Sequence, residues 1–69
     1  MKTDIYNTLC KHFEAHIEKH AMNVRIMLNN PMAIHEHTDF MGAVEEQLAH
    51  IAEYQDKLEA LQRVFLDYE

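Results

Sequence analysis

Apolar residues recur along two long stretches of this chain at the three- and four-residue spacing of an amphipathic helix. In the first stretch, a heptad has these a and d positions: Thr3, Tyr6, Cys10, Phe13, Ile17, His20, Val24 and Met27. In the second stretch, the a and d positions are Met41, Val44, Leu48, Ile51, Gln55, Leu58, Gln62 and Phe65. Four further residues widen this second stripe at multiples of seven: Phe40, Tyr54, Leu61 and Tyr68. Both stretches are therefore predicted to be helices with one apolar face.

The residues Asn29-Asn30-Pro31 separate the two stretches. Proline cannot occupy a helix interior, and it disfavours helical backbone at the residue before it. Thr38 or Asp39 then stands at the N-cap of the second helix. The expected elements of one domain are a helix over about 3–28, a connector over about 29–37 and a helix over about 38–68.

A single hairpin of two such helices would leave part of each apolar face in water, because each helix covers only part of the other. The predicted fold is therefore an all-α two-helix antiparallel hairpin that pairs into a dimeric four-helix bundle. A higher homo-oligomer, an element of a larger assembly and helices swapped between subunits remain open. The predicted oligomer seam consists of Phe13, Ile17, Val24, Leu48, Ile51, Leu58 and Phe65.

The charge of the chain limits the partners it is expected to have. Six Lys and Arg stand against twelve Asp and Glu, for a net charge of −6. Binding to nucleic acid needs a basic face, so we expect none. The acidic second half leaves open an alternative, an inhibitor that occupies the nucleic-acid site of another protein. No apolar run approaches the roughly 20 residues of a membrane span, so no membrane association is expected.

Several catalytic and redox arrangements are missing from the sequence. With one cysteine the chain cannot form an internal disulfide, which favours a reducing, cytoplasmic location. The chain has no serine, and its one glycine, Gly42, rules out a phosphate-cradling loop. Cys10 has Phe13 and Glu14 rather than histidine at the next turn, so a small buried side chain is expected there. We therefore predict that the protein is not an enzyme.

Six histidines are the one unusual feature of the composition. His12, His16 and His20 are spaced by four, so consecutive imidazoles could share a divalent transition metal with acidic residues of the second helix. The competing interpretation is that the ladder turns from the surface at His12 to a hydrogen-bonded core position at His20. His35 and His37 in the connector form a weaker metal hypothesis. Otherwise no cofactor is expected, and the Glu-x-x-His motif of di-iron bundles is absent.

Two stretches of the sequence carry a general resemblance. The segments Cys10-Lys-His-Phe-Glu-Ala-His16 and Asn30-Pro-Met-Ala-Ile-His-Glu-His37 resemble short helical proteins encoded by tailed phages of marine cyanobacteria. The resemblance implies an accessory or structural protein in the host cytoplasm, and it carries over no functional residue. Together with the pattern, it leads us to expect a small non-enzymatic assembly or adaptor protein that self-associates and could bind another protein. A metal-binding bundle built on His12, His16 and His20 is the alternative.

Overall fold

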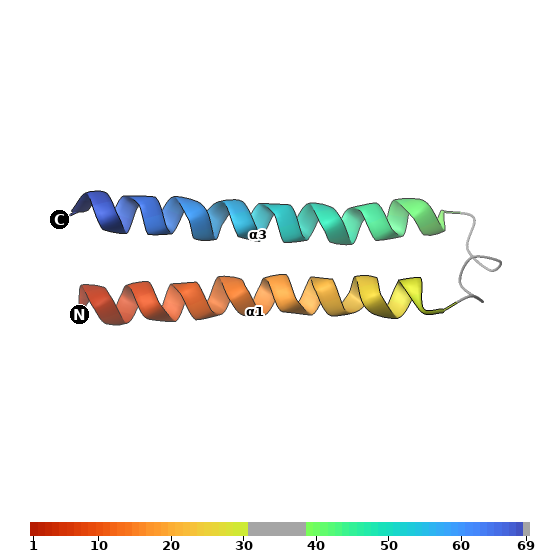
Figure 1. Ribbon diagram of the computed structural model, residues 1–69, viewed down its shortest axis with the longest axis horizontal. Helices are drawn as coiled ribbons and strands as arrows, with labels where there is room; N and C mark the ends of the chain where they lie inside the picture. The colour runs from red at the N-terminus through yellow and green to blue at the C-terminus, as the bar shows by residue number, and fades with distance from the viewer. Residues whose placement is uncertain (31–38, 69) are drawn as a thin grey trace.

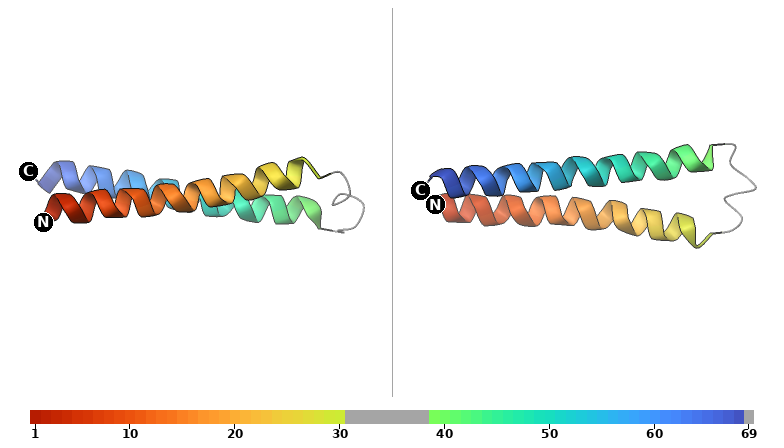
Figure 2. Two further views of the ribbon diagram at one scale, coloured as in Figure 1. Left: turned by 90° about the horizontal axis from the view of Figure 1, so that it is seen from below. Right: turned by 45° about the horizontal axis from the view of Figure 1, so that its top comes forward.

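Two long helices lie side by side and run in opposite directions (Figure 1). The computed structural model describes residues 1–30 and 39–68. Helix α1 spans Lys2–Leu28 and helix α3 spans Phe40–Tyr68. Both chain termini lie at the same end of a rod about 53 Å long, and the helices cross at a shallow angle (Figure 2). All regular structure in the described ranges is helical, so the predicted all-α two-helix antiparallel hairpin is confirmed.

The helix ends follow from short polar side chains near the connector. At the end of α1, the Asn29 side-chain amide donates to the Arg25 carbonyl at 2.8 Å, and the backbone N–H of Asn29 donates to the same oxygen at 3.1 Å. At the start of α3, the backbone N–H of Gly42 donates to Asp39 Oδ1 at 3.2 Å. Asp39 is therefore the N-cap, one of the two predicted residues. A Cβ at Gly42 would collide with the Asp39 carboxylate, so the glycine leaves room for the cap.

The shielded side of α1 is the side that its heptad predicts. All the predicted a and d positions after Thr3 are at least partly shielded, and Thr3 is exposed. In α3 the predicted d positions are partly shielded: Val44, Ile51, Leu58 and Phe65. The four predicted a positions are exposed: Met41, Leu48, Gln55 and Gln62. The stripe expected only to widen the seam faces α1 instead, with Phe40, Tyr54 and Leu61 partly shielded. This exchange of one stripe for the other leaves Gln55 and Gln62 exposed and brings aromatic area into the contact.

The described hairpin does not enclose an apolar core of its own. Among residues 1–30 and 39–67, His20 is the only buried side chain. Several large apolar side chains are mostly exposed, among them Met41 at 80% and Leu28 at 67%. A chain this small has little stability to spare even with a filled core. The exposed apolar surface is therefore the main structural feature that a function must account for.

Candidate functional site

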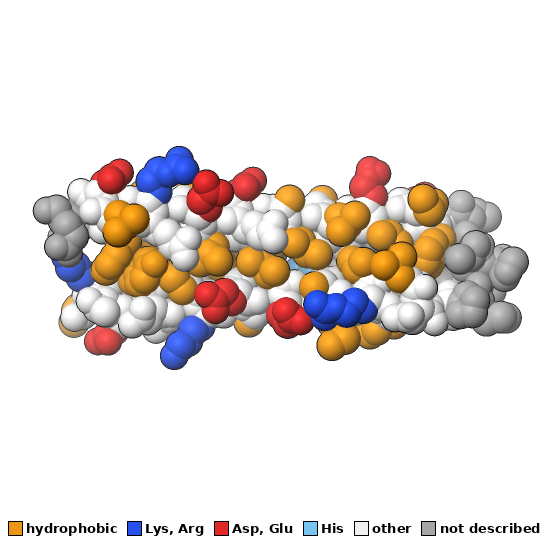
Figure 3. All heavy atoms as spheres, viewed as in Figure 1, with side chains coloured by type: hydrophobic (Ala, Val, Ile, Leu, Met, Phe, Trp, Pro, Cys, Tyr) orange, Lys and Arg blue, Asp and Glu red, His pale blue; other side chains and the backbone are white. Residues whose placement is uncertain are grey.

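Apolar side chains are exposed on both flanks of the hairpin, and the longer row of them lies on one flank. Ile5 and Val64 line a surface pocket together and so mark the opposite flank. One set of apolar residues on α1 and another on α3 repeat at heptad spacing, so each set lies along one side of its own helix. Both sets lie away from the flank that carries Ile5 and Val64. We call their surface the apolar face; its residues are Cys10, Ile17, Val24 and Leu28 of α1 with Met41, Val44, Leu48, Ile51 and Leu58 of α3. Figure 3 shows apolar atoms along the groove between the helices, with charged groups towards the margins.

The predicted seam residues divide between the apolar face and the contact between the helices. Ile17, Val24, Ile51 and Leu58 are half-buried on the apolar face, and Leu48 is 50% exposed there. The two phenylalanines lie between α1 and α3. Phe65 stacks on Tyr6 with ring centroids 4.0 Å apart, and Phe13 lies 6.3 Å from the Tyr54 ring. These residues therefore hold the hairpin together, and most of them still present surface to a further partner.

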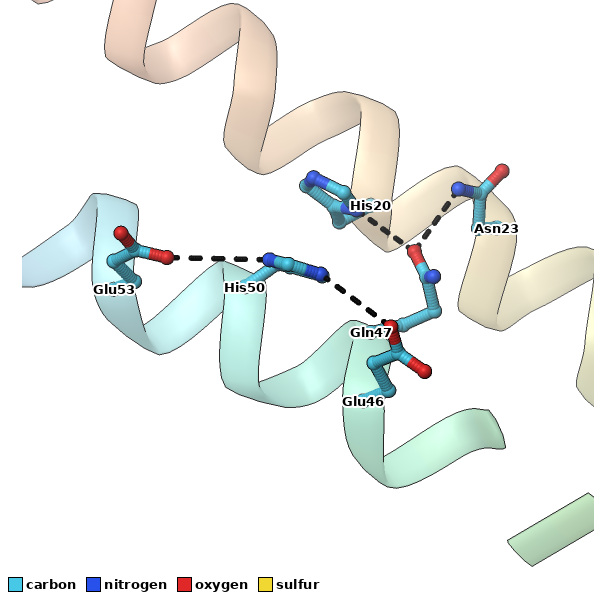
Figure 4. Close-up of polar contacts among 6 residues, drawn as sticks. All are labelled: His20, Asn23, Glu46, Gln47, His50 and Glu53. Atoms are coloured by element: carbon cyan, nitrogen blue, oxygen red, sulfur yellow. Dashed lines mark hydrogen bonds and ion pairs between the residues drawn. The ribbon is translucent and has the colours of Figure 1, made fainter. Parts of the chain in front are cut away.

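A polar cluster occupies the middle of the contact between the helices (Figure 4). His20, only 9% exposed, lies with Nδ1 2.7 Å from Gln47 Oε1, and Asn23 Nδ2 donates to the same oxygen at 3.0 Å. An amide oxygen only accepts, so His20 carries a proton on Nδ1. The interpretation of His20 as a hydrogen-bonded core histidine is confirmed. Sequence analysis missed Gln47, although it continues the seven-residue spacing of Phe40, Tyr54 and Leu61.

A second histidine extends this cluster on α3. The His50 ring stacks on His20 with centroids 4.6 Å apart and an interplanar angle of 21°. Glu46 and Glu53 approach the two ring nitrogens of His50 at 3.9 Å each (Figure 4). Lys57 lies 3.1 Å from Glu53, and its hydrogen bond and charge lower the pKa of that carboxyl group. The His50 ring therefore lies between two carboxylates of its own helix.

The histidine ladder turns around α1 instead of converging on one point. His12 is exposed and meets His16 edge-on at 4.6 Å, while His16 stacks on Tyr54 at 4.4 Å. His20 turns towards Gln47. Across residues 1–30 and 39–68, no three His, Cys, Asp or Glu side chains are placed to hold a metal ion together. His35 and His37, the other proposed ligands, lie outside the described residues.

The surroundings of His16 disfavour its charged form. Partial burial lowers its pKa below the usual value of 6.5, and His12 and Lys19 lower it further by repulsion. A histidine with a depressed pKa in the folded state contributes stability above the pKa of the unfolded chain. That stability is lost as the pH falls below about 6.5, because protons bind preferentially to the unfolded chain.

We expect the melting temperature to fall between pH 7.5 and pH 5.5, and to fall less in the His16→Gln variant. Circular dichroism at 222 nm, read during thermal unfolding at the two pH values, checks this. His12→Gln removes one of the repelling charges but leaves the partial burial of His16, so it is expected to reduce the pH dependence by less than His16→Gln does. An equal pH dependence in the His16→Gln variant and the unchanged protein would contradict the assignment to His16.

Cys10 is a free, half-buried cysteine on α1. It lies one turn from Tyr6, and a hydrogen bond with Cys10, followed by burial, raises the pKa of the tyrosine. The side chain that was expected to be buried is thus only half-buried in the hairpin. The prediction that the protein is not an enzyme stays a prediction.

Comparison with protein-family models, with curated proteins and with solved structures finds no match for this chain. Within the described ranges, neither helix has an apolar stretch long enough to cross a membrane.

Proposed function

We propose that this chain is a small non-enzymatic assembly or adaptor protein of the cytoplasm that pairs with a second copy of itself through the apolar face. Two hairpins packed face to face would form a dimeric four-helix bundle, in which side chains of all four helices fill one core. The dimer would then be the unit that binds a further protein. Such a unit fits the accessory or structural role that the resemblance to phage proteins implies.

The observation that carries this proposal is the exposure of apolar side chains on one flank. Leu28, Met41 and Leu48 are between 50% and 80% exposed in the isolated hairpin. Each fully buried side chain of this size contributes about 1.5–3 kcal/mol relative to an exposed one. Covering this flank therefore offers a chain of this length the stability that its own two helices do not supply.

A second copy suits this flank because a row of apolar side chains runs along the groove between its two helices (Figure 3). Charged groups lie towards its margins, where they stay in water when two such faces meet (Figure 3). An interface between identical copies places the same apolar residues on both sides, so apolar meets apolar along the whole rod. The shallow crossing of α1 and α3 is the geometry that four-helix bundles extend (Figure 2).

Sedimentation velocity of the Leu48→Asp variant tests the proposal. Leu48 is half-exposed in the hairpin, so an aspartate there leaves the α1–α3 contact largely unchanged but brings a carboxylate into the dimer core. We expect the unchanged protein to sediment as a dimer, at twice the 8.2 kDa chain mass. The dimer dissociation constant of the variant is expected to be about 100-fold higher than that of the unchanged protein, which corresponds to about 2.7 kcal/mol of lost association free energy.

Val64→Asp is the matched control on the same helix. Val64 is 65% exposed on the opposite flank, so this variant carries the same charge and is expected to remain a dimer. A monomeric unchanged protein at micromolar concentration would overturn the proposal. So would equal dissociation of both variants, because that would place the interface elsewhere.

A further inference from the structure

The apolar pattern alone does not determine how far α3 is shifted along α1. Both contact stripes repeat every seven residues, so a slide by one heptad again places apolar side chains against apolar side chains. Such a slide moves one helix past the other by about 10 Å, at 1.5 Å per residue. Apolar contacts tolerate exchange of one large side chain for another. A register therefore has to be selected by side chains that require a particular partner.

The cluster of His20, Asn23 and Gln47 is a polar contact between α1 and α3 in which each side chain needs a particular partner. Two hydrogen bonds to Gln47 Oε1 join the helices at their middle, and His20 also stacks on His50. A slide of one heptad replaces His50 by Ala43 or Lys57. It also separates His20 from Gln47, which leaves a buried imidazole without this partner.

From this geometry we propose that His20, Asn23 and Gln47 form a register lock that selects one axial alignment of α1 and α3. A buried donor or acceptor that loses its partner costs free energy, so each shifted register is disfavoured at this point. A polar group buried in an apolar helix contact contributes more to the choice of one arrangement than to stability, as polar residues at single core positions of coiled coils do. Leucines at these sites would keep the helices paired and remove the selection.

An electron-paramagnetic-resonance distance measurement between α1 and α3 tests the lock. Spin labels are attached at Thr8→Cys and Glu45→Cys, both exposed positions, in a Cys10→Ala background. Because Asn23 lies level with Gln47, the labels are about 25 Å apart along the axis at 1.5 Å per residue. Dilution with unlabelled protein restricts the signal to pairs within one chain. The labelled protein is expected to give one narrow distance distribution.

The His20→Leu/Gln47→Leu variant is expected to add populations displaced by about 10 Å along the axis, with its helix content retained. Gln47→Leu alone is measured as a second variant, since it breaks the same hydrogen bonds with one substitution, and it is expected to broaden the distribution too. The matched control is His12→Leu/Gln55→Leu, which makes the same chemical changes at exposed positions and is expected to keep one distance. A single unshifted distance in both lock variants would overturn the proposal, as would equal broadening in the control.

Discussion

Replacing Ile51 with aspartate is expected to abolish the folded structure. Ile51 lies half-buried at the middle of α3, where it belongs both to the contact with α1 and to the apolar face. A carboxylate placed there costs about 3 kcal/mol or more, because the surrounding helix contact removes water from its charge. A single core of this size supplies only about 3–5 kcal/mol. Circular dichroism should show the loss of most helical signal at 25 °C, and sedimentation should show a monomer.

The control for this experiment is the neighbouring residue. Ala52 is exposed, and Ala52→Asp adds the same charge with a larger loss of helix propensity, because alanine is a better helix former than isoleucine. It is expected to leave both the helical signal and the oligomer in place. A folded Ile51→Asp protein with unchanged sedimentation would show that neither the hairpin contact nor the apolar face depends on this position.

Replacing Tyr54 with alanine is expected to cause the second-largest loss of stability. The Tyr54 ring stacks on His16 at 4.4 Å, lies 6.3 Å from Phe13 and carries the Lys57 ammonium group at 5.0 Å from its centroid. Aromatic pairs contribute about 0.5–1.5 kcal/mol beyond the area they bury. Because Tyr54 is only half-buried, we expect a loss of about 2–3 kcal/mol, below the range for a core aromatic residue. Urea unfolding followed by circular dichroism measures it.

Tyr54→Phe separates the ring from its hydroxyl group. The phenylalanine ring keeps the stacking, so a change of less than about 0.5 kcal/mol is expected. A loss in Tyr54→Phe as large as that in Tyr54→Ala would mean that the hydroxyl group, and not the ring, stabilises the hairpin.

The two helices differ in how well their contact sides could be predicted from the sequence. In α1 one stripe is clearly the most apolar, and the structure shields that stripe. In α3 two adjacent stripes compete, one through Met41 and Leu48 and one through Phe40, Tyr54 and Leu61. The single-helix pattern does not say which stripe meets α1, because both are compatible with an amphipathic helix. Packing against α1 selects the stripe that carries Tyr54, and it leaves Leu48 exposed.

The candidate functional surfaces show the same limit. The pattern predicted that Ile17, Val24, Ile51 and Leu58 belong to a seam, because burial of apolar area depends mainly on residue type and spacing. It did not single out Gln47, because a glutamine becomes significant only when a partner such as His20 lies within hydrogen-bond distance. Contacts between residues 27 positions apart depend on how the chain folds back.

The sequence by itself determined the two helices, the break near Pro31 and an N-cap at Thr38 or Asp39, because these follow from backbone sterics, local hydrogen bonds and periodicity within a few residues. Only the tertiary structure decided which side of α3 meets α1, where the histidines go and which apolar residues stay exposed. It did so because burial and hydrogen bonding between helices depend on their rotation and axial alignment. That alignment joins His20 to Gln47 and leaves the apolar face open to a partner.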